Sequence, residues 1–312
     1  MQIRYIERSD INDEQWNRCI DGAVNGIVYA YTWYLDIVSP NWCALVMENY
    51  SYVFPLPALK QLGVETLSQP LFTQQLGLFS RGHITPEILN SFFESTPAKY
   101  KFISVHLNTL NRYSGGFHSL ERVTYQLDLI SNYSQIQSKY NQNTRRNNLK
   151  ALAFGVSVTK NIELATFLEF YRKNLAVKFA NSSFNRVVQI SESLIKKEKA
   201  EVVGAYYQGI LCAAALIVKS NGKLIYLFAS SNHLGIKHRA MFSVVDQIIR
   251  WNAENHLVLD FEGSIIPSIA RFYAGFGAKP CAYQSINVNR LPFYANVLFK
   301  LKIILKRFKS KI

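Results

Sequence analysis

Short stretches rich in apolar residues predict strands across the first half of the chain. They cover residues 42–48, 52–59, 71–78, 102–107 and 122–127. In the last two, apolar and polar residues alternate, as expected where every second side chain of a strand faces the same side of a sheet. Helices are predicted at residues 12–21, 32–39 and 86–95. The last of these begins on Pro86, a residue type favoured in a first helical turn.

The second half contains longer helices and a clear run of hairpins. Helical periodicity predicts helices at residues 133–152, 162–174, 184–199, 238–254 and 268–275. Strands are predicted at residues 156–160, 200–207, 210–219, 224–230, 257–261 and 285–289. Turns at Gln208-Gly209 and Asn221-Gly222 connect the longest strands, and an Asn-Gly pair is a strong hairpin signal.

This order of elements predicts an α+β protein in which helices flank mixed, mostly antiparallel sheets. We expect two such domains, at residues 1–130 and 131–290, followed by a tail at residues 291–312. A length of 312 residues and a hydrophobic fraction of 49% are sufficient for two domains with a core each.

Composition argues against several classes of protein. The cysteines are scattered and form no CxxC pair, and the six histidines show no metal-binding spacing. We therefore expect no disulfide framework and no metal, and each cysteine is interpreted as a small buried residue. The polar start lacks the apolar segment of a signal peptide, and no apolar run reaches the roughly 18 residues that span a bilayer. A reduced, cytoplasmic protein is expected.

Positive charge is concentrated in the second half of the chain. Residues 1–140 contain 10 Lys and Arg against 12 Asp and Glu, whereas residues 141–312 contain 25 against 9. The second half therefore carries all of the net charge of +14. Such an excess favours an anionic partner: the phosphates of a cofactor or substrate, a nucleic acid, or a membrane surface.

Three stretches of the second half carry motifs. Residues 125–158 combine Arg145, Arg146, Asn147 and Lys150 with a following Gly-Val strand. Residues 223–231 have the sequence KLIYLFASS and precede the basic segment KHRAMFSVVDQ, and residues 259–280 have the sequence LDFEGSIIPSIARFYAGFGAKP. Together these stretches resemble the GNAT superfamily, and more narrowly the tandem-GNAT proteins related to the Fem aminoacyl transferases of peptidoglycan synthesis. The resemblance implies two GNAT-like domains and acyl or aminoacyl transfer.

Tyr273 stands at a position where Fem enzymes usually have a lysine. Acetyltransferases with a related motif place a tyrosine beside the leaving thiolate, so the resemblance implies that Tyr273 is the acid and that acetyl-CoA or another acyl-CoA is the donor. An aminoacyl-tRNA donor is less expected. The alternative for Tyr273 is an aromatic core position on a helix that also contains Phe272 and Phe276.

Asp260 and Glu262 alternate on the strand predicted at residues 257–261 and just beyond it, which would turn both carboxylates to one face. Two carboxylates so placed can supply a general base and bind an amine, because their proximity raises one pKa. The alternative is structural: a cap for the next helix, or a partner for Arg271.

Basic residues suggest two anion-binding sites. Lys237, His238 and Arg239 lie at a predicted helix start, where backbone N–H groups attract phosphates. With Ser264 they are the candidate cofactor-binding residues, although capping of the helix at residues 268–275 is the more expected role for Ser264. The resembling acetyltransferases carry a glycine-rich pyrophosphate loop, of which this segment retains one glycine, so a solvated charged turn is the alternative.

Arg145, Arg146 and Arg271 are the candidate substrate-binding residues, with a solvated helix face as the alternative for the first two. In the tail, apolar residues form a helical stripe beside several lysines. Such a helix suits an anionic membrane surface, or packs its stripe on the protein itself.

The function we expect is N-acyl transfer to an amine of a cell-envelope precursor or related metabolite, either a small molecule or lipid-linked. The protein would be cytoplasmic and peripheral to the inner membrane. The alternative is a non-catalytic GNAT-fold binding module held at the membrane by its tail. A tRNA partner is a further hypothesis that no nucleic-acid-binding motif supports.

Overall fold

The structure is a computed structural model, and it describes residues 2–175, 179–263 and 266–292. Two compact units divide the chain. Among the described residues, the first contains residues 2–122 and 283–292, and the second contains residues 123–175, 179–263 and 266–282. The sequence placed the boundaries at residues 130 and 290, whereas the units found here change at residues 122 and 282, within or beside two long strands. These strands are β8 (His118–Asp128) and β14 (Lys279–Asn289).

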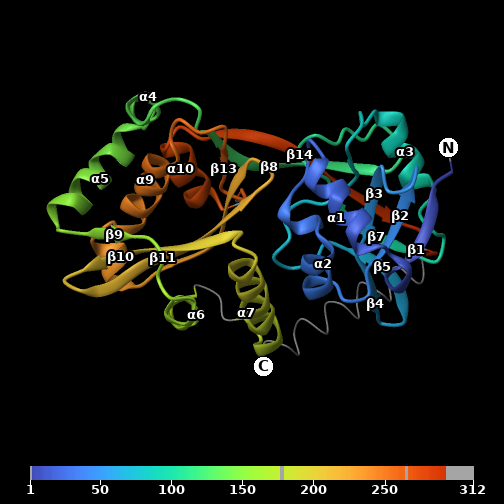
Figure 1. Cartoon of the computed structure of the whole chain (residues 1–312), viewed down its shortest axis with the longest axis horizontal. Helices are drawn as coiled ribbons and strands as arrows, with labels where there is room; N and C mark the ends of the chain where they lie inside the picture. Colours follow the sequence, from blue (N-terminus) through green and yellow to red (C-terminus); the bar gives the residue numbers. More distant parts are fainter. Residues whose placement is uncertain (1, 176–178, 264–265, 293–312) are drawn as a thin grey trace. The chain divides into compact units, whose positions relative to one another are not determined.

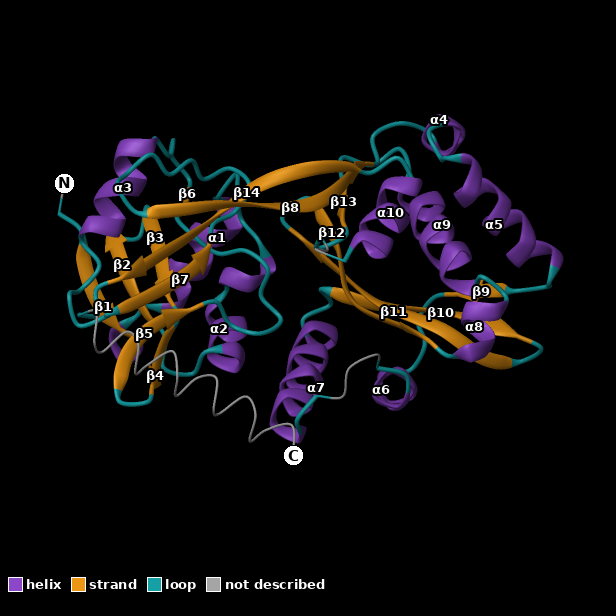
Figure 2. Ribbon diagram, turned by 180° about the vertical axis from the view of Figure 1, so that it is seen from behind, coloured by secondary structure: helices purple, strands orange, loops and turns teal. Residues whose placement is uncertain are grey.

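Two sheets and three α-helices build the first unit (Figures 1 and 2). One sheet is antiparallel, in the order β1 (Arg4–Glu7), β2 (Cys43–Met47), β3 (Tyr52–Leu56) and β6 (Phe79–Ser80). The other has the order β4 (Ala58–Gln61), β5 (Val64–Ser68), β7 (Phe102–His106) and β14. The helices are α1 (Asp13–Gly22), α2 (Thr32–Val38) and α3 (Pro86–Glu94). Their buried faces follow the apolar periodicity of the sequence.

The strand predicted at residues 71–78 is wrong. Within it only Leu76 makes a β-bridge, to Leu107. Phe72 and Gly77 have φ angles of 62° and 110°, and such left-handed residues interrupt an extended chain. The predicted strand at residues 52–59 divides into β3 and β4 at Pro57, which has no N–H to offer a neighbouring strand. The prediction also missed β1 and β5.

The second unit has one mixed sheet with helices on both faces. Its strands run in the order β8, β13 (Val258–Asp260), β12 (Lys223–Ser231), β11 (Ile210–Ser220), β10 (Ala200–Tyr207) and β9 (Ser157–Thr159). The pair β12 and β13 is parallel and its neighbours are antiparallel. The α+β class with mostly antiparallel sheets is thereby confirmed.

Helices cover both faces of this sheet (Figure 2). One face carries α4 (Tyr133–Ser138), α5 (Gln142–Ala153), α9 (Ala240–Asn252) and α10 (Pro267–Gly275). The other carries α6 (Leu164–Lys173) and α7 (Asn181–Lys196). The short helix α8 (His233–Lys237) precedes α9. In the core, Val244, Val245 and Ile248 of α9 are buried with Ala213 and Ala215 of β11.

Local chemistry explains where these elements begin and turn. The helix predicted at residues 133–152 is interrupted at Asn141, whose side chain caps α5 by accepting a hydrogen bond from the N–H of Thr144 at 2.8 Å. The helix predicted from residue 238 begins at Ala240, because Arg239 has a φ of 60°. Asn221 and Gly222 are both left-handed, as a tight hairpin turn requires. No helix of the described residues is long and apolar enough to cross a membrane.

Candidate functional site

The parallel strands β12 and β13 separate after a short contact. They pair over only three positions, Lys223–Ile225 with Val258–Asp260. Beyond that point β12 contains a β-bulge at Leu227, and the N–H of Phe261 donates instead to the carbonyl of Tyr125 on β8, at 2.9 Å. Bulges re-aim side chains and recur beside active sites. The separation opens the sheet next to α9 and α10.

A cavity of about 310 Å³ lies at this opening. Its walls come from β12, from the first turn of α9 and from α10. Tyr226, Phe272 and Tyr273 contribute aromatic rings and Met241 a thioether, and Ser230, Ser231 and Ser268 contribute hydroxyl groups. The Tyr226 hydroxyl donates to the sulfur of Met241 at 2.8 Å. The opening therefore combines an apolar wall with a few polar groups, as is typical of small-molecule sites.

Tyr273 lies on the wall of this cavity within a group of aromatic rings. Its ring stacks on Phe261 with centroids 4.6 Å apart, and Tyr125 and Tyr226 lie at 6.3 Å. Burial raises the pKa of Tyr273 above its ordinary value, and the negative charge of Glu262 raises it further. A phenol with such a pKa stays protonated near neutral pH, so Tyr273 can donate a proton but does not act as a base.

Glu262 is a carboxyl group with an unsatisfied oxygen. Its Oε1 is buried and has no hydrogen-bond partner among the described residues. Burial raises the pKa of Glu262 to about 8, since the charged form loses its hydration. The residue as a whole keeps some exposure, so the carboxyl group lies at the edge of the interior. A carboxyl group with this pKa can take up and release a proton near neutral pH.

Asp260 has a different role from Glu262. Its carboxylate accepts hydrogen bonds from the side chains of Thr124 at 2.6 Å and Gln126 at 2.8 Å, and from the N–H of Glu262 at 3.0 Å. Lys223 adds an ion pair at 3.8 Å. The strand β13 ends at Asp260 and Glu262 is left-handed, with a φ of 57°, so the expected alternation of the two carboxylates along one strand is wrong. These contacts make Asp260 an anchor between strands.

The basic residues before α9 point in different directions. Lys237 and Arg239 are exposed at the start of the helix. His238 is buried and stacks on Tyr207 with centroids 3.8 Å apart, on the side of β10. The segment therefore presents two of its three basic side chains to an anion. Ser264, the remaining candidate cofactor-binding residue, lies outside the described residues.

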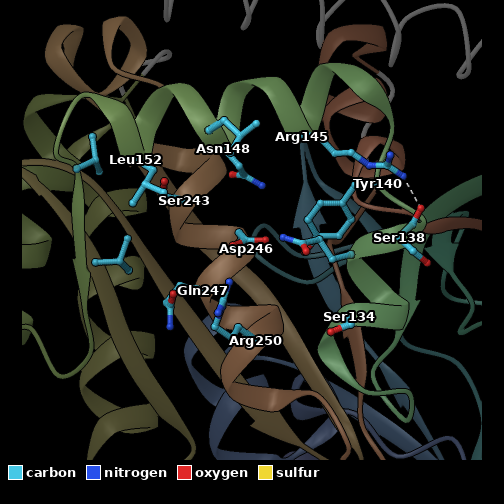
Figure 3. A pocket seen from close by; sticks show the side chains of 14 residues that line it. Ser134, Ser138, Tyr140, Arg145, Asn148, Leu152, Ser243, Asp246, Gln247 and Arg250 are labelled. Carbon is cyan, nitrogen blue, oxygen red and sulfur yellow. Dashed lines mark hydrogen bonds between the residues drawn. The ribbon is translucent and has the colours of Figure 1, made fainter.

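The three arginines assigned to substrate do not converge on one site: Arg145 and Arg146 are neighbours on α5, whereas Arg271 lies on α10. Arg145 lines a second, larger cavity beneath α5 and donates to the carbonyl of Ser138 (Figure 3). Arg146 is exposed on α5 and donates to Asn143 at 3.3 Å. Arg271 is exposed on α10. Only Arg271 shares an element with the cavity at the strand opening.

Sequence reasoning missed Tyr226, Met241 and the two serines at the end of β12. The motif stretches included all of them, yet nothing in the pattern marked them as cavity residues. What marks these residues as cavity residues is the strand pairing in the structure: β13, the parallel partner of β12, pairs with it over only three residues. In the ranges 2–175, 179–263 and 266–292, no group of His, Cys, Asp and Glu is arranged to hold a metal ion.

Comparison with solved structures places the fold. The structure of FemX superimposes with a TM-score of 0.66 at 12% identity, over 91% of this chain and 97% of that chain. L-PGS from Bacillus licheniformis superimposes with a TM-score of 0.54 at 9% identity, over 96% of this chain and 97% of that chain. The C-terminal domain of a proposed lysylphosphatidylglycerol synthetase from Agrobacterium fabrum superimposes with a TM-score of 0.53 at 8% identity, over 94% of this chain and 95% of that chain. No family model and no curated protein matches the sequence.

These likenesses define the class of fold. The chain shares the fold of FemX over nearly the full length of both chains, in agreement with the Fem-like fold that its motifs predicted. At sequence identities of 12% and below, the comparison shows the fold alone, and the reaction has to be inferred from the residues of the site.

Proposed function

We propose that this protein is a transferase that moves an acyl or aminoacyl group to an amine, with its reaction centre in the cavity at the separation of β12 and β13. One observation carries the proposal. Glu262 is a buried carboxyl group with an unsatisfied oxygen, and burial raises its pKa to about 8. Its negative charge raises the pKa of Tyr273, which lines the cavity, so the two groups influence each other electrostatically.

The two residues would divide the proton transfers of the reaction. The amine nitrogen attacks the acyl carbon, so a C–N bond forms and the bond to the leaving group breaks. Glu262 accepts the proton that the nitrogen loses, and Tyr273 donates its phenolic proton to the leaving atom. Transfer of the proton from Glu262 to the phenolate, directly or through water, restores both groups. Asp260 would position Glu262 through its hydrogen bond from the Glu262 N–H.

Acyl-CoA is the donor that we propose, and the described residues offer it a partial fit. Exposed Lys237, at the end of α8, and Arg239, directly before α9, would hold its phosphates, helped by the positive end of the α9 helix dipole. His238 does not fit this role, because it is buried against Tyr207. When bound, the donor would supply the activated acyl carbon.

For the acceptor we propose an amine of a cell-envelope precursor, either small or lipid-linked. FemX and the lysylphosphatidylglycerol synthetase fold share this architecture, and the latter name refers to an aminoacylated lipid. The excess of positive charge at residues 141–312 suits an anionic acceptor or membrane. The protein would then act in the cytoplasm at the inner membrane, with the tail at residues 291–312 as its contact. This tail lies outside the structure's described residues. Aminoacyl-tRNA remains the second donor to test.

The proposal is tested by donor binding and turnover. Thermal-shift measurements with acetyl-CoA, longer acyl-CoAs and an aminoacyl-tRNA mimic identify the donor, since a ligand of the native state raises the melting temperature. With that donor and a panel of amines, Glu262→Gln and Tyr273→Phe should each lower kcat by about 10²-fold or more while the melting profile stays that of a folded protein. Full activity of both variants would refute this assignment of the site.

A non-catalytic binding module is the alternative, favoured by the small number of phosphate-binding groups before α9. It predicts that donor binding is absent and that the full chain binds anionic vesicles. Removal of residues 300–312 should then release it from vesicles of phosphatidylglycerol, whereas the enzyme hypothesis requires turnover in either case.

A further inference from the structure

A second cavity of the same unit lies between α4, α5 and α9, separate from the opening between β12 and β13. Its volume is about 730 Å³, and no residue that lines it also lines the smaller cavity. A volume of roughly 300–1,000 Å³ is usual for a small-molecule site. Figure 3 shows its polar side chains converging on one space.

One polar side chain in this cavity, Asn148, has unmet hydrogen-bonding capacity. Both of its amide atoms are buried and lack partners among the described residues. The hydroxyl of Tyr140, by contrast, interacts with the carboxylate of Asp246: burial raises the pKa of Tyr140, and the negative charge of Asp246 raises it further. A buried polar group without a partner is unfavourable. Asn148 is therefore suited to a ligand that offers it both a hydrogen-bond acceptor and a donor.

The charged groups that face the cavity favour an anion. Arg145 and Arg250 contribute guanidinium groups, and Asp246 contributes the opposing carboxylate. The hydroxyl of Tyr133 donates to both oxygens of Asp246, at 2.9 and 3.1 Å, which disperses that negative charge. Among the described residues neither arginine forms a salt bridge. One guanidinium group is thus left without a counter-charge.

Arg250 is also held in place. Its Cζ lies 4.0 Å from the centroid of the Tyr133 ring, a cation–π contact. Arg145 is fixed by its hydrogen bond to the carbonyl of Ser138. Preorganised guanidinium groups bind an oxyanion with less loss of conformational freedom than free ones.

The remaining part of the wall is apolar. Leu149 and Leu152 of α5 and Val156 and Val158 beside β9 line it. Leu149 and Leu152 are 67% and 72% exposed, which is unusual for large aliphatic side chains at a cavity edge. The cavity therefore has a cationic, hydrogen-bonding end and an aliphatic end.

We propose that this cavity is a second ligand site, which binds a small organic oxyanion with a hydrogen-bond donor and an aliphatic arm. The oxyanion would accept from Arg145 and Arg250. The amide of Asn148 would receive the donor and contribute its own N–H. The aliphatic arm would lie along Leu149 and Leu152. A carboxylate and a phosphate monoester share this chemistry, and the probes below separate them.

The test uses the full chain and a matched series of probes. N-acetyl-L-leucine has the carboxylate, the N–H donor and the arm; N-acetyl-L-leucinamide lacks the charge, and N-acetylglycine lacks the arm. Hexyl phosphate carries the same kind of arm on a phosphate. By ligand-observed NMR or calorimetry, N-acetyl-L-leucine or hexyl phosphate should bind about tenfold more tightly than the uncharged or armless probes.

Variants locate the binding. Asn148→Leu and Arg250→Gln should each weaken the better probe by about tenfold, a loss usual for a charge-assisted or buried hydrogen bond. Arg186→Gln, on α7 at the other face of the sheet, should leave binding unchanged. Asp246→Asn should strengthen binding, because it removes the repulsion of an anion. Melting curves verify that each variant is folded.

Three results would overturn the proposal: no binding of either charged probe, equal binding of the uncharged probe, or binding that Asn148→Leu and Arg250→Gln leave intact in folded protein. These results do not depend on the transferase assay, since no variant used here alters the cavity between β12 and β13. Turnover of Glu262→Gln therefore tests the proposed transferase site, and probe binding in the cavity between α5 and α9 tests the second ligand site independently.

Discussion

Replacement of Glu262 by glutamine should stabilise the protein, and increasingly so as the pH rises. Burial raises the pKa of this carboxyl group from the ordinary 4.5 to about 8. Because the folded-state pKa is the higher one, the group favours folding fully below pH 4.5, and this contribution is lost as the pH rises through about 8. Glutamine has nearly the same shape and no charge, so the variant does not lose free energy of unfolding at this position as the pH rises.

The magnitude follows from the pKa difference. At about 1.4 kcal/mol for each pKa unit, the difference corresponds to roughly 4–5 kcal/mol for a fully buried carboxylate. Glu262 keeps partial exposure, and solvent screening reduces the effect to about 2 kcal/mol. In a unit of this size that corresponds to a rise in melting temperature of roughly 4–8 °C.

Differential scanning calorimetry at about pH 5 and about pH 9 measures this effect. The melting temperatures of wild type and Glu262→Gln should nearly coincide at the lower pH and diverge at the higher. The matched control is Glu192→Gln on α7, where the side chain is exposed and no pH-dependent difference is expected. A difference for Glu262→Gln that stays constant between the two pH values would refute the assignment of a buried, raised-pKa carboxyl group.

Two further substitutions test the packing around the site. Asp260→Ala removes the acceptor for two side-chain donors of β8 and for the Glu262 N–H, and should lower the free energy of unfolding by about 2–4 kcal/mol in urea titrations; a loss under about 0.5 kcal/mol would contradict its role as an anchor. Gly235→Ala would place a Cβ 2.1 Å from the carbonyl oxygen of Cys212, so the melting temperature should fall sharply, whereas Gly116→Ala meets open space and should leave it unchanged. Equal melting temperatures for the two alanine variants would show that α8 shifts to accommodate the side chain.

Much of the fold was accessible from the sequence because it depends on local chemistry. The Asn-Gly turn and the alternation beside it identified the long hairpins of the second unit. Pro86 predicted the start of α3, and the structure adds a cap there, with the Thr85 hydroxyl accepting from the N–H of Ile88. The elements that were missed or misplaced depend on distant partners. The strand β5 pairs in parallel with β7, more than thirty residues later, and its sequence has no marked alternation.

The sequence predicted which segment contains the candidate site, but not how the side chains of that site are arranged. The motif at residues 259–280 identified Glu262 and Tyr273, and the structure places their charges within range of each other. The roles of His238 and Asp260 were not predictable, because each depends on neighbours far along the chain. Tyr207 buries the first, and Thr124 and Gln126 satisfy the second. The periodicity of a sequence predicts on which face of a strand or helix a side chain lies, but it does not predict which hydrogen-bond donors lie near that side chain.

The two carboxylates of the Asp-Phe-Glu segment illustrate how a fold separates structural from chemical roles. The strand β13 ends at Asp260, whose four polar contacts fix the chain at that point. One of those contacts is the N–H of Glu262, which holds the next carboxyl group in a left-handed conformation beyond the strand. An unpaired carboxyl group in that position is unfavourable on its own. Its position is maintained because the contacts of Asp260 fix the backbone around it. Full satisfaction of Asp260 thus accompanies an unsatisfied carboxyl group two residues later, in Glu262.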